Sequence, residues 1–295
     1  MNLKRFKVAK QASVLGILGN LFLFIIKMIV ALLSSSQAMI ADAMNSASDI
    51  LSSIMTYIGN KVASVEADED HNLGHGKAEY IYSMLISITM IILGGKILID
   101  SFLSLIKPSQ LDFSIWLIVV CLVTIVVKLC LYLYTNKLGK KYNNLLLEAN
   151  SKDHRNDCVI TLFNLLSALF YLWGIKFFDG VVGIGISLWI VYTGFSIFKS
   201  SYDVLMDKTF SFETKDKVMK IIEKYDEIKK INHFNATPVG YLYQVSFSIF
   251  VDGNMSTFES HKIANDLERE IEKKVPEIYL TVIHVNPYEE KDNEK

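Results

Sequence analysis

The chain has 295 residues, of which 51% are hydrophobic and only 21% are charged, and its net charge is −1. This composition favours a membrane protein over a soluble enzyme of the same length. The balanced charge excludes the basic excess that nucleic-acid binding needs. The three cysteines lie in apolar stretches without a CxxC spacing, so we interpret them as small core residues rather than as disulfides or zinc ligands.

Six segments are predicted to span a membrane as helices. A span needs about 20 mostly apolar residues, and five segments meet this criterion. A sixth is less apolar but rich in Ala and Ser, which suits a helix that packs inside a bundle. In chain order the expected spans are 12–33, 37–61, 80–105, 113–135, 158–176 and 180–199.

Basic residues between the spans indicate the orientation, because cytoplasmic loops carry an excess of Lys and Arg. The N-terminal segment and the connection after the fourth span are basic, whereas the opposite loops hold one basic residue at most. The residues on the basic side are Lys4, Arg5, Lys7, Lys10, Lys137, Lys140, Lys141 and Lys152. Both termini are therefore expected in the cytoplasm, and we expect the protein in the cell membrane.

After the last span, the sequence becomes rich in charged residues, as in a soluble domain. A helix is expected at 213–225, strands at 241–251 and 279–286, and a helix that opens with the capping box Ser256 to Glu259 and runs to about Lys274. The order α-β-β-α-β predicts a small α+β domain. We expect a basic tail at 1–11, a six-helix transmembrane domain at 12–202, a cytoplasmic domain at 203–290 and a charged tail at 291–295.

Polar residues inside the spans are candidates for function, because they are costly in a membrane. Asn45 and Asp49 are four residues apart, which places them on one face of a helix, and Asp153 and Asp157 repeat this spacing. If the two faces meet, four oxygen-bearing side chains form a cage for one cation. Alternatively, they cap or bond neighbouring helices, and hydropathy alone permits Asp153 and Asp157 in a loop. Asp42, seven residues before Asp49, could line the exit path.

A second candidate metal site is Asp68, His71 and His75, in the loop between the second and third spans. Two imidazoles four residues apart, with a carboxylate three residues earlier, can bind a divalent metal. The alternative is a solvated acidic loop with incidental histidines.

Five segments together resemble the cation diffusion facilitator family: AMIADAMNSASDI, DEDHNLGHGKAE, KDHRND, SHKIANDLE and VIHVNP. The matching positions run from about residue 14 to residue 288. The resemblance implies a six-helix bundle, a cytoplasmic domain with a metallochaperone-like fold, a homodimer and export of a divalent metal against protons.

The resemblance also implies roles for particular residues. It assigns the transport site to Asn45, Asp49, Asp153 and Asp157, the loop site to Asp68, His71 and His75, a charge interlock between protomers to Lys77 and Asp207, and cytoplasmic metal binding to His233, His261 and His284. Ser246 and Asn286 stand where metal-binding members have a histidine and an aspartate, so the cytoplasmic site is expected to be incomplete.

The donor set of the transport site indicates the metal. By the same resemblance, Asn45 and Asp153 stand where zinc-selective members have histidines, and the combination of NxxxD with DxxxD resembles the manganese branch of the family. Only oxygen donors are left, and these favour Mn²⁺ over Zn²⁺. His154 points about 100° away from Asp153. We therefore expect a proton-coupled Mn²⁺ exporter without a prosthetic group, with Zn²⁺ or Fe²⁺ as alternative substrates. A membrane-anchored metal sensor is the alternative of a different class, whereas the lack of an HExxH motif argues against an enzyme.

Overall fold

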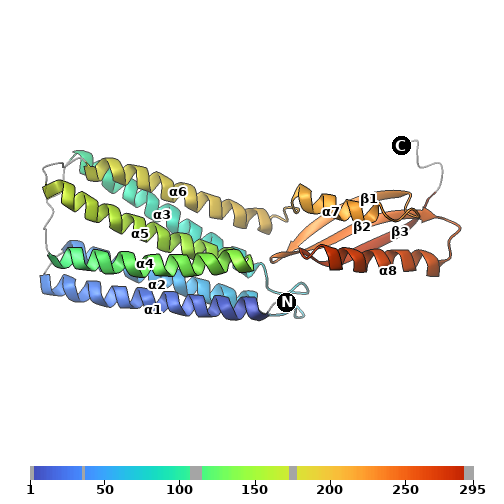
Figure 1. The fold of residues 1–295 in the computed structure, drawn as a ribbon, viewed down its shortest axis with the longest axis horizontal. Helices are drawn as coiled ribbons and strands as arrows, with labels where there is room; N and C mark the ends of the chain where they lie inside the picture. Colours follow the sequence, from blue (N-terminus) through green and yellow to red (C-terminus); the bar gives the residue numbers. More distant parts are fainter. Residues whose placement is uncertain (1–2, 35–36, 107–114, 173–177, 289–295) are drawn as a thin grey trace. The chain divides into compact units, whose positions relative to one another are not determined.

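The structure is a computed structural model that describes residues 3–34, 37–106, 115–172 and 178–288 (Figure 1). The chain forms two compact units, Met1–Tyr202 and Asp203–Lys295. The first is helical and the second contains a small mixed sheet. The expected fold class, a helical membrane domain followed by an α+β domain, is confirmed.

Six long helices make up the first unit. They are α1 Leu3–Ser34, α2 Gln37–Ala63, α3 Ala78–Ile106, α4 Ile115–Tyr142, α5 Leu145–Leu172 and α6 Phe178–Leu205. Within the described residues, α1, α3 and α4 each contain a stretch that is long and apolar enough to cross a membrane, at 4–30, 78–103 and 118–142. The count of six spans stays a prediction. The first helix begins at Leu3, so most of the expected basic tail is helical.

Many large apolar side chains of the bundle face outward, and many small or polar side chains are buried between the helices. Leu18 and Phe22 of α1 are exposed, whereas Ser13 and Asn20 of the same helix are fully buried. The helix α1 packs along α2, α4 packs along α5, and α2 also contacts α3 and α5. This distribution suits a bundle in lipid, where close packing and polar contacts between helices replace the hydrophobic effect.

The helix α5 begins at Leu145, well before the apolar segment 158–176 that predicted its span. Asn144 caps it, since its Oδ1 atom accepts a hydrogen bond of 2.8 Å from the N–H of Leu147. The carboxylate of Glu79 accepts another, of 2.6 Å, from the N–H of Leu145. Both side chains satisfy N–H groups that a helix start leaves without partners. Asp153 and Asp157 therefore lie within the helix and not in a loop.

The second unit has the order α-β-β-α-β. Its elements are α7 Phe212–Ile222, β1 Lys230–Val239, β2 Leu242–Asp252, α8 Thr257–Lys274 and β3 Ile278–Tyr288. The strand β2 lies between the others, antiparallel to β1 and parallel to β3. Alternate residues of β2, including Val245, Phe247 and Ile249, pack in one core with Val218 of α7 and Leu267 of α8.

Candidate metal centres

Three carboxylates meet inside the helical bundle. Asp49 lies on α2, and Asp153 and Asp157 lie one turn apart on α5. Each offers one oxygen, and these oxygens lie within 4.8 Å of one another. The three residues are 6%, 6% and 4% exposed. The structure therefore brings together three of the four residues that the sequence assigned to a cation site.

The helix α1 holds the α2 side of this cluster in place. The side-chain amide of Asn20 donates hydrogen bonds of 3.1 Å to the main-chain oxygen of Asp49 and of 3.0 Å to Oγ of Ser53. One turn earlier in α1, a Cβ atom on Gly16 would lie 3.1 Å from the same Oγ. The absence of a side chain at Gly16 thus permits the close approach of α1 to α2.

Lys128 of α4 is part of the cluster, although the spacing of the carboxylates in the sequence does not predict it. Its ammonium group donates hydrogen bonds of 2.6 Å to Oδ2 of Asp49 and of 2.6 Å to Oδ2 of Asp157. The side chain is 1% exposed. A single lysine in the apolar run VTIVVKLCLYL was the signal available, because a charge in the middle of a span marks a functional position.

Two carboxylate oxygens of the cluster accept no hydrogen bond from the described residues and are available as ligands. Within the described part of the chain, Oδ2 of Asp153 and Oδ1 of Asp157 are buried without a hydrogen-bond partner. Buried polar atoms are nearly always paired in folded proteins, and exceptions point to a ligand or a functional role. Carboxylate oxygens are ligands that suit Mg²⁺, Ca²⁺ and Mn²⁺. The arrangement can thus hold a divalent cation through oxygen atoms.

Asn45 lies on α2 one turn before Asp49, and Asp42 lies one turn earlier still. The side chains of both fall outside the described part of the structure, so their expected roles stay predictions.

His154 follows Asp153 in α5 but does not join the carboxylates. The described group of possible ligands at this site contains Asp49, Asp153 and Asp157 and no histidine. A Cβ atom on Gly16 would lie 3.7 Å from Nε2 of His154, so the ring faces α1. Its two nitrogens are buried without a partner among the described residues.

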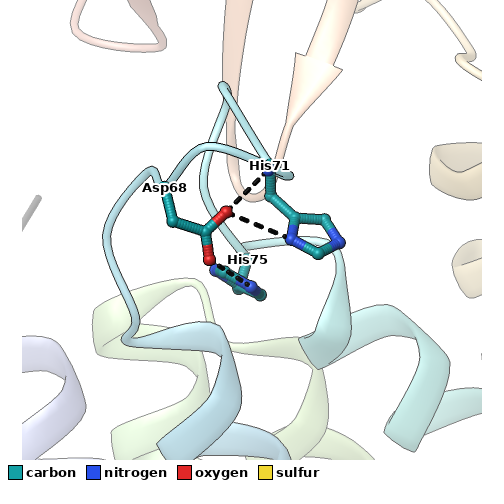
Figure 2. Close-up of side chains that lie close together, drawn as sticks. All are labelled: Asp68, His71 and His75. Atoms are coloured by element: carbon teal, nitrogen blue, oxygen red, sulfur yellow. Dashed lines mark hydrogen bonds and ion pairs between the residues drawn. The ribbon is translucent and has the colours of Figure 1, made fainter.

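The loop between α2 and α3 brings Asp68, His71 and His75 together (Figure 2). One oxygen of Asp68 accepts a hydrogen bond of 2.6 Å from the N–H of His71 and lies 3.3 Å from Nδ1 of that residue. Its other oxygen lies 3.5 Å from Nε2 of His75. Gly74, with φ of +73°, provides the left-handed turn that carries the chain back to His75.

The electrostatics of this loop suit a cation. The backbone N–H of His71 is the main cause that holds the pKa of Asp68 below its usual value of 3.8. Nδ1 of His75 lies 3.3 Å from the carbonyl oxygen of Glu66, an arrangement that orients the ring and leaves Nε2 toward Asp68. The loop therefore offers an ionised carboxylate and a preoriented imidazole side by side.

The cytoplasmic histidines do not form a comparable cluster. His233 lies on β1 with φ of +52°, His261 on α8 and His284 on β3, and all three are exposed. In the described residues, neither group of three or more possible metal ligands contains any of them. His261 lines a surface pocket together with Asp252 and Asn286.

The two residues of the expected charge interlock lie at the ends of helices. Lys77 immediately precedes α3, and Asp207 follows α6 with φ of +55°.

Known families match almost the whole chain. Residues 13–206 match the cation efflux transmembrane domain, and residues 211–288 match the cytoplasmic domain of cation efflux proteins. The chain belongs to the cation efflux family. Its members, also called cation diffusion facilitators, are metal transporters and not enzymes, so this chain is a membrane protein that exports divalent metal.

Individual relatives match this transporter over nearly their whole length. The manganese efflux system protein MneP of Bacillus subtilis is 28% identical over 293 residues, which cover 97% of this chain and 98% of MneP. The manganese efflux system protein MneS of the same organism is 28% identical over 287 residues, 97% of this chain and 98% of MneS. Among solved structures, the metal-bound C-terminal domain of the CzcD transporter from Thermotoga maritima is 25% identical, covers 25% of this chain and 87% of that domain, and has a TM-score of 0.25.

Proposed function

We propose that this transporter exports Mn²⁺ from the cytoplasm in exchange for protons. The observation that carries the proposal is the buried group of Asp49, Asp153 and Asp157, which offers oxygen ligands and no imidazole or thiolate among the described residues. Such a donor set suits Mn²⁺, whereas Zn²⁺ favours sites with nitrogen and sulfur. The names of MneP and MneS support the same metal. Asn45 would add a fourth oxygen.

Proton coupling follows from the chemistry of clustered carboxylates. Like charges this close disfavour one another's ionised forms, so the group takes up protons when no metal is bound. Metal and protons then compete for the same oxygens. If the site opens to the two sides in turn, metal that loads from the cytoplasm leaves as protons enter from outside, and the proton gradient drives export.

The loop group of Asp68, His71 and His75 would bind a second divalent ion. Because it contains two imidazoles and is partly exposed, it differs from the membrane site in both donor type and access. We assign it a supporting role and not the transport step. Metal binding by His233, His261 and His284 in the cytoplasmic domain would need further ligands, since neither described ligand group contains any of them.

The proposal also covers the oligomeric state of the protein and its location in the cell. Two copies would form a homodimer through the cytoplasmic domain, with Lys77 and Asp207 as an ion pair between protomers at the membrane surface. The transporter would reside in the cell membrane with both termini in the cytoplasm. The excess of basic residues on the N-terminal side of the bundle supports this orientation.

Flux into proteoliposomes with an imposed pH gradient tests the proposal. Mn²⁺, Fe²⁺ and Zn²⁺ are compared for the unchanged protein, for Asp157→Asn and for Asp100→Asn, an exposed carboxylate of α3 that serves as the control. We expect Mn²⁺ flux that requires the gradient and is lost only in Asp157→Asn. Preferred Zn²⁺ or Fe²⁺ flux would refute the manganese assignment. Absence of flux for every metal would favour a sensor.

A further inference from the structure

The proposed transport site already contains a cation that belongs to the protein. The ammonium nitrogen of Lys128 lies 2.6 Å from an oxygen of Asp49 and 2.6 Å from an oxygen of Asp157. The lysine comes from the middle of α4, whereas the carboxylates come from α2 and α5. One ammonium group therefore connects three helices at the point where metal is proposed to bind.

A divalent ion and this ammonium group cannot share the position between the two oxygens. Metals of this class bind carboxylate oxygens at about 2.0–2.2 Å, so a bound ion would occupy nearly the place of the Lys128 nitrogen. Two cations only a few ångströms apart repel each other strongly in a buried environment. A metal held by all three carboxylates therefore moves the ammonium group away from at least one of them.

The charge of the cluster gives a reason for a lysine at this position. Three ionised carboxylates in the bundle would be costly without positive charge beside them. Lys128 offsets one of the three negative charges, and the two that remain can be neutralised either by one divalent ion or by two protons. The lysine can thus stabilise the metal-free bundle and still leave a site that attracts a metal.

We propose that Lys128 is a tethered competitor of the metal: it pairs with Asp49 and Asp157 in the empty transporter, is displaced as metal loads, and returns as metal leaves. The inference rests on the proposed transport site. It adds that Lys128 lowers the affinity of this site for metal and so favours metal release. Where one binding event changes the affinity of another, the change is typically about 5- to 150-fold, and we expect the ammonium group to act on metal affinity in this range.

Substitutions that change the charge of this side chain, or the strength of its pairing with Asp49 and Asp157, test the inference. Mn²⁺ binding is measured by calorimetry on the purified full-length protein at one neutral pH, with His71→Ala and His75→Ala present so that the loop does not contribute. Lys128→Gln should bind Mn²⁺ about 5- to 150-fold more tightly and release it more slowly in stopped-flow experiments. Lys96→Gln, at an exposed lysine of α3, should change nothing.

The opposite substitution should have the opposite sign. Lys128→Arg keeps the charge and pairs with carboxylates through two parallel hydrogen bonds, so it is harder to displace and should weaken Mn²⁺ binding by at least about fivefold. A lysine that only holds the helices together would lead to weaker binding in both variants, and that result, or unchanged affinity in both, would overturn the inference.

Two further results are decisive. If Lys128→Gln does not fold, Lys128→Arg still tests the inference, because unchanged or tighter Mn²⁺ binding in that variant contradicts competition. The protein that retains Lys128 should bind Mn²⁺, and Asp157→Asn should abolish this binding. If either expectation fails, the proposed transport site itself is refuted, and the inference is refuted with it.

Discussion

Arg5 and Glu79, from the first turns of α1 and α3, form a buried ion pair of 2.6 Å, with side chains 2% and 1% exposed. Arg5 also donates hydrogen bonds to the carbonyl oxygens of Tyr142 and Asn143, where α4 ends. Glu79 accepts a hydrogen bond from the N–H of Leu145, where α5 begins. The pair therefore connects the beginnings of α1, α3 and α5, the last of which carries two of the site carboxylates.

We expect Glu79→Gln to destabilise the bundle strongly. The substitution leaves the buried Arg5 guanidinium without its charged partner, and loss of one member of a buried pair costs about 3–5 kcal/mol. Thermal unfolding of the detergent-purified protein, followed by intrinsic fluorescence, measures the effect. Glu69→Gln, at an exposed acid of the α2–α3 loop, is the control and should unfold at the original temperature. Equal stability of the two variants would contradict the role of the pair.

Asn144→Ala should loosen the first turn of α5. The substitution removes the cap on Leu147 and a hydrogen bond of 2.9 Å to Oδ1 of Asn60 in α2, and loss of such a cap costs about 1 kcal/mol. Hydrogen exchange should become faster in the first turn of α5 and weaker Mn²⁺ binding should accompany it, because Asp153 lies only two turns further on. Unchanged exchange at 145–148 would contradict this account. Asn72→Ala, at an exposed loop residue, is the control.

Gly59→Ala should destabilise the contact of α2 with α3 and α5. A Cβ atom at this position would lie 2.7 Å from Cβ of Tyr82 and 2.7 Å from Cδ2 of Leu146, and such overpacking costs about 1–3 kcal/mol. Gly95→Ala is the matched control, because no atom lies within 4 Å of its added Cβ. Alanine favours a helix, so the control should be neutral or slightly stabilising. Thermal unfolding distinguishes the two, and the same effect from both substitutions would exclude the steric explanation.

Metal binding at the loop should decrease below neutral pH because protons compete for the imidazoles and not for Asp68. The lowered pKa of Asp68 keeps its carboxylate ionised, and its stabilising contribution to the loop is lost only as the pH falls through that lowered value. Imidazoles, by contrast, bind metal only when they are neutral, so protonation releases the metal.

Cobalt absorption spectra at pH 7.5 and pH 5.5 measure this binding. The signal of the loop should require His71, His75 and Asp68, whereas Asp70→Asn, at a neighbouring exposed acid, should preserve it. A signal that stays constant at pH 5.5 would show that the imidazoles are not ligands.

Local patterns in the sequence were sufficient where short-range contacts determine the structure. The alternation of Val245, Phe247 and Ile249 predicted a half-buried strand, and β2 buries these side chains. The capping box of Ser256 and Glu259 forms at the start of α8. In both cases, the signal and the interaction lie within a few residues of each other.

Contacts between distant segments could not be predicted in this way. The start of α5 depends on Glu79, which is 66 residues away from Leu145. Hydropathy placed that start too late, because the first turns of α5 are polar. The helix begins there because Glu79 of α3 accepts a hydrogen bond from its first N–H group. Lys128 could have been singled out as a buried charge in an apolar span, but its pairing with Asp49 and Asp157 depends on how α4 packs against α2 and α5.

Pulsed electron paramagnetic resonance of bound Mn²⁺ is the most direct test of the central claim, that carboxylate oxygens in the bundle bind the transported ion. The measurement uses the full-length protein without the loop and cytoplasmic histidines, so that of the proposed sites only the membrane site contributes. The substitutions are His71→Ala, His75→Ala, His233→Ala, His261→Ala and His284→Ala. We predict one Mn²⁺ per chain, without magnetic coupling to imidazole nitrogen, and loss of the signal in Asp157→Asn but not in Asp100→Asn. Strong nitrogen coupling, or a signal that survives Asp157→Asn, would contradict an oxygen-only site formed by Asp49, Asp153 and Asp157.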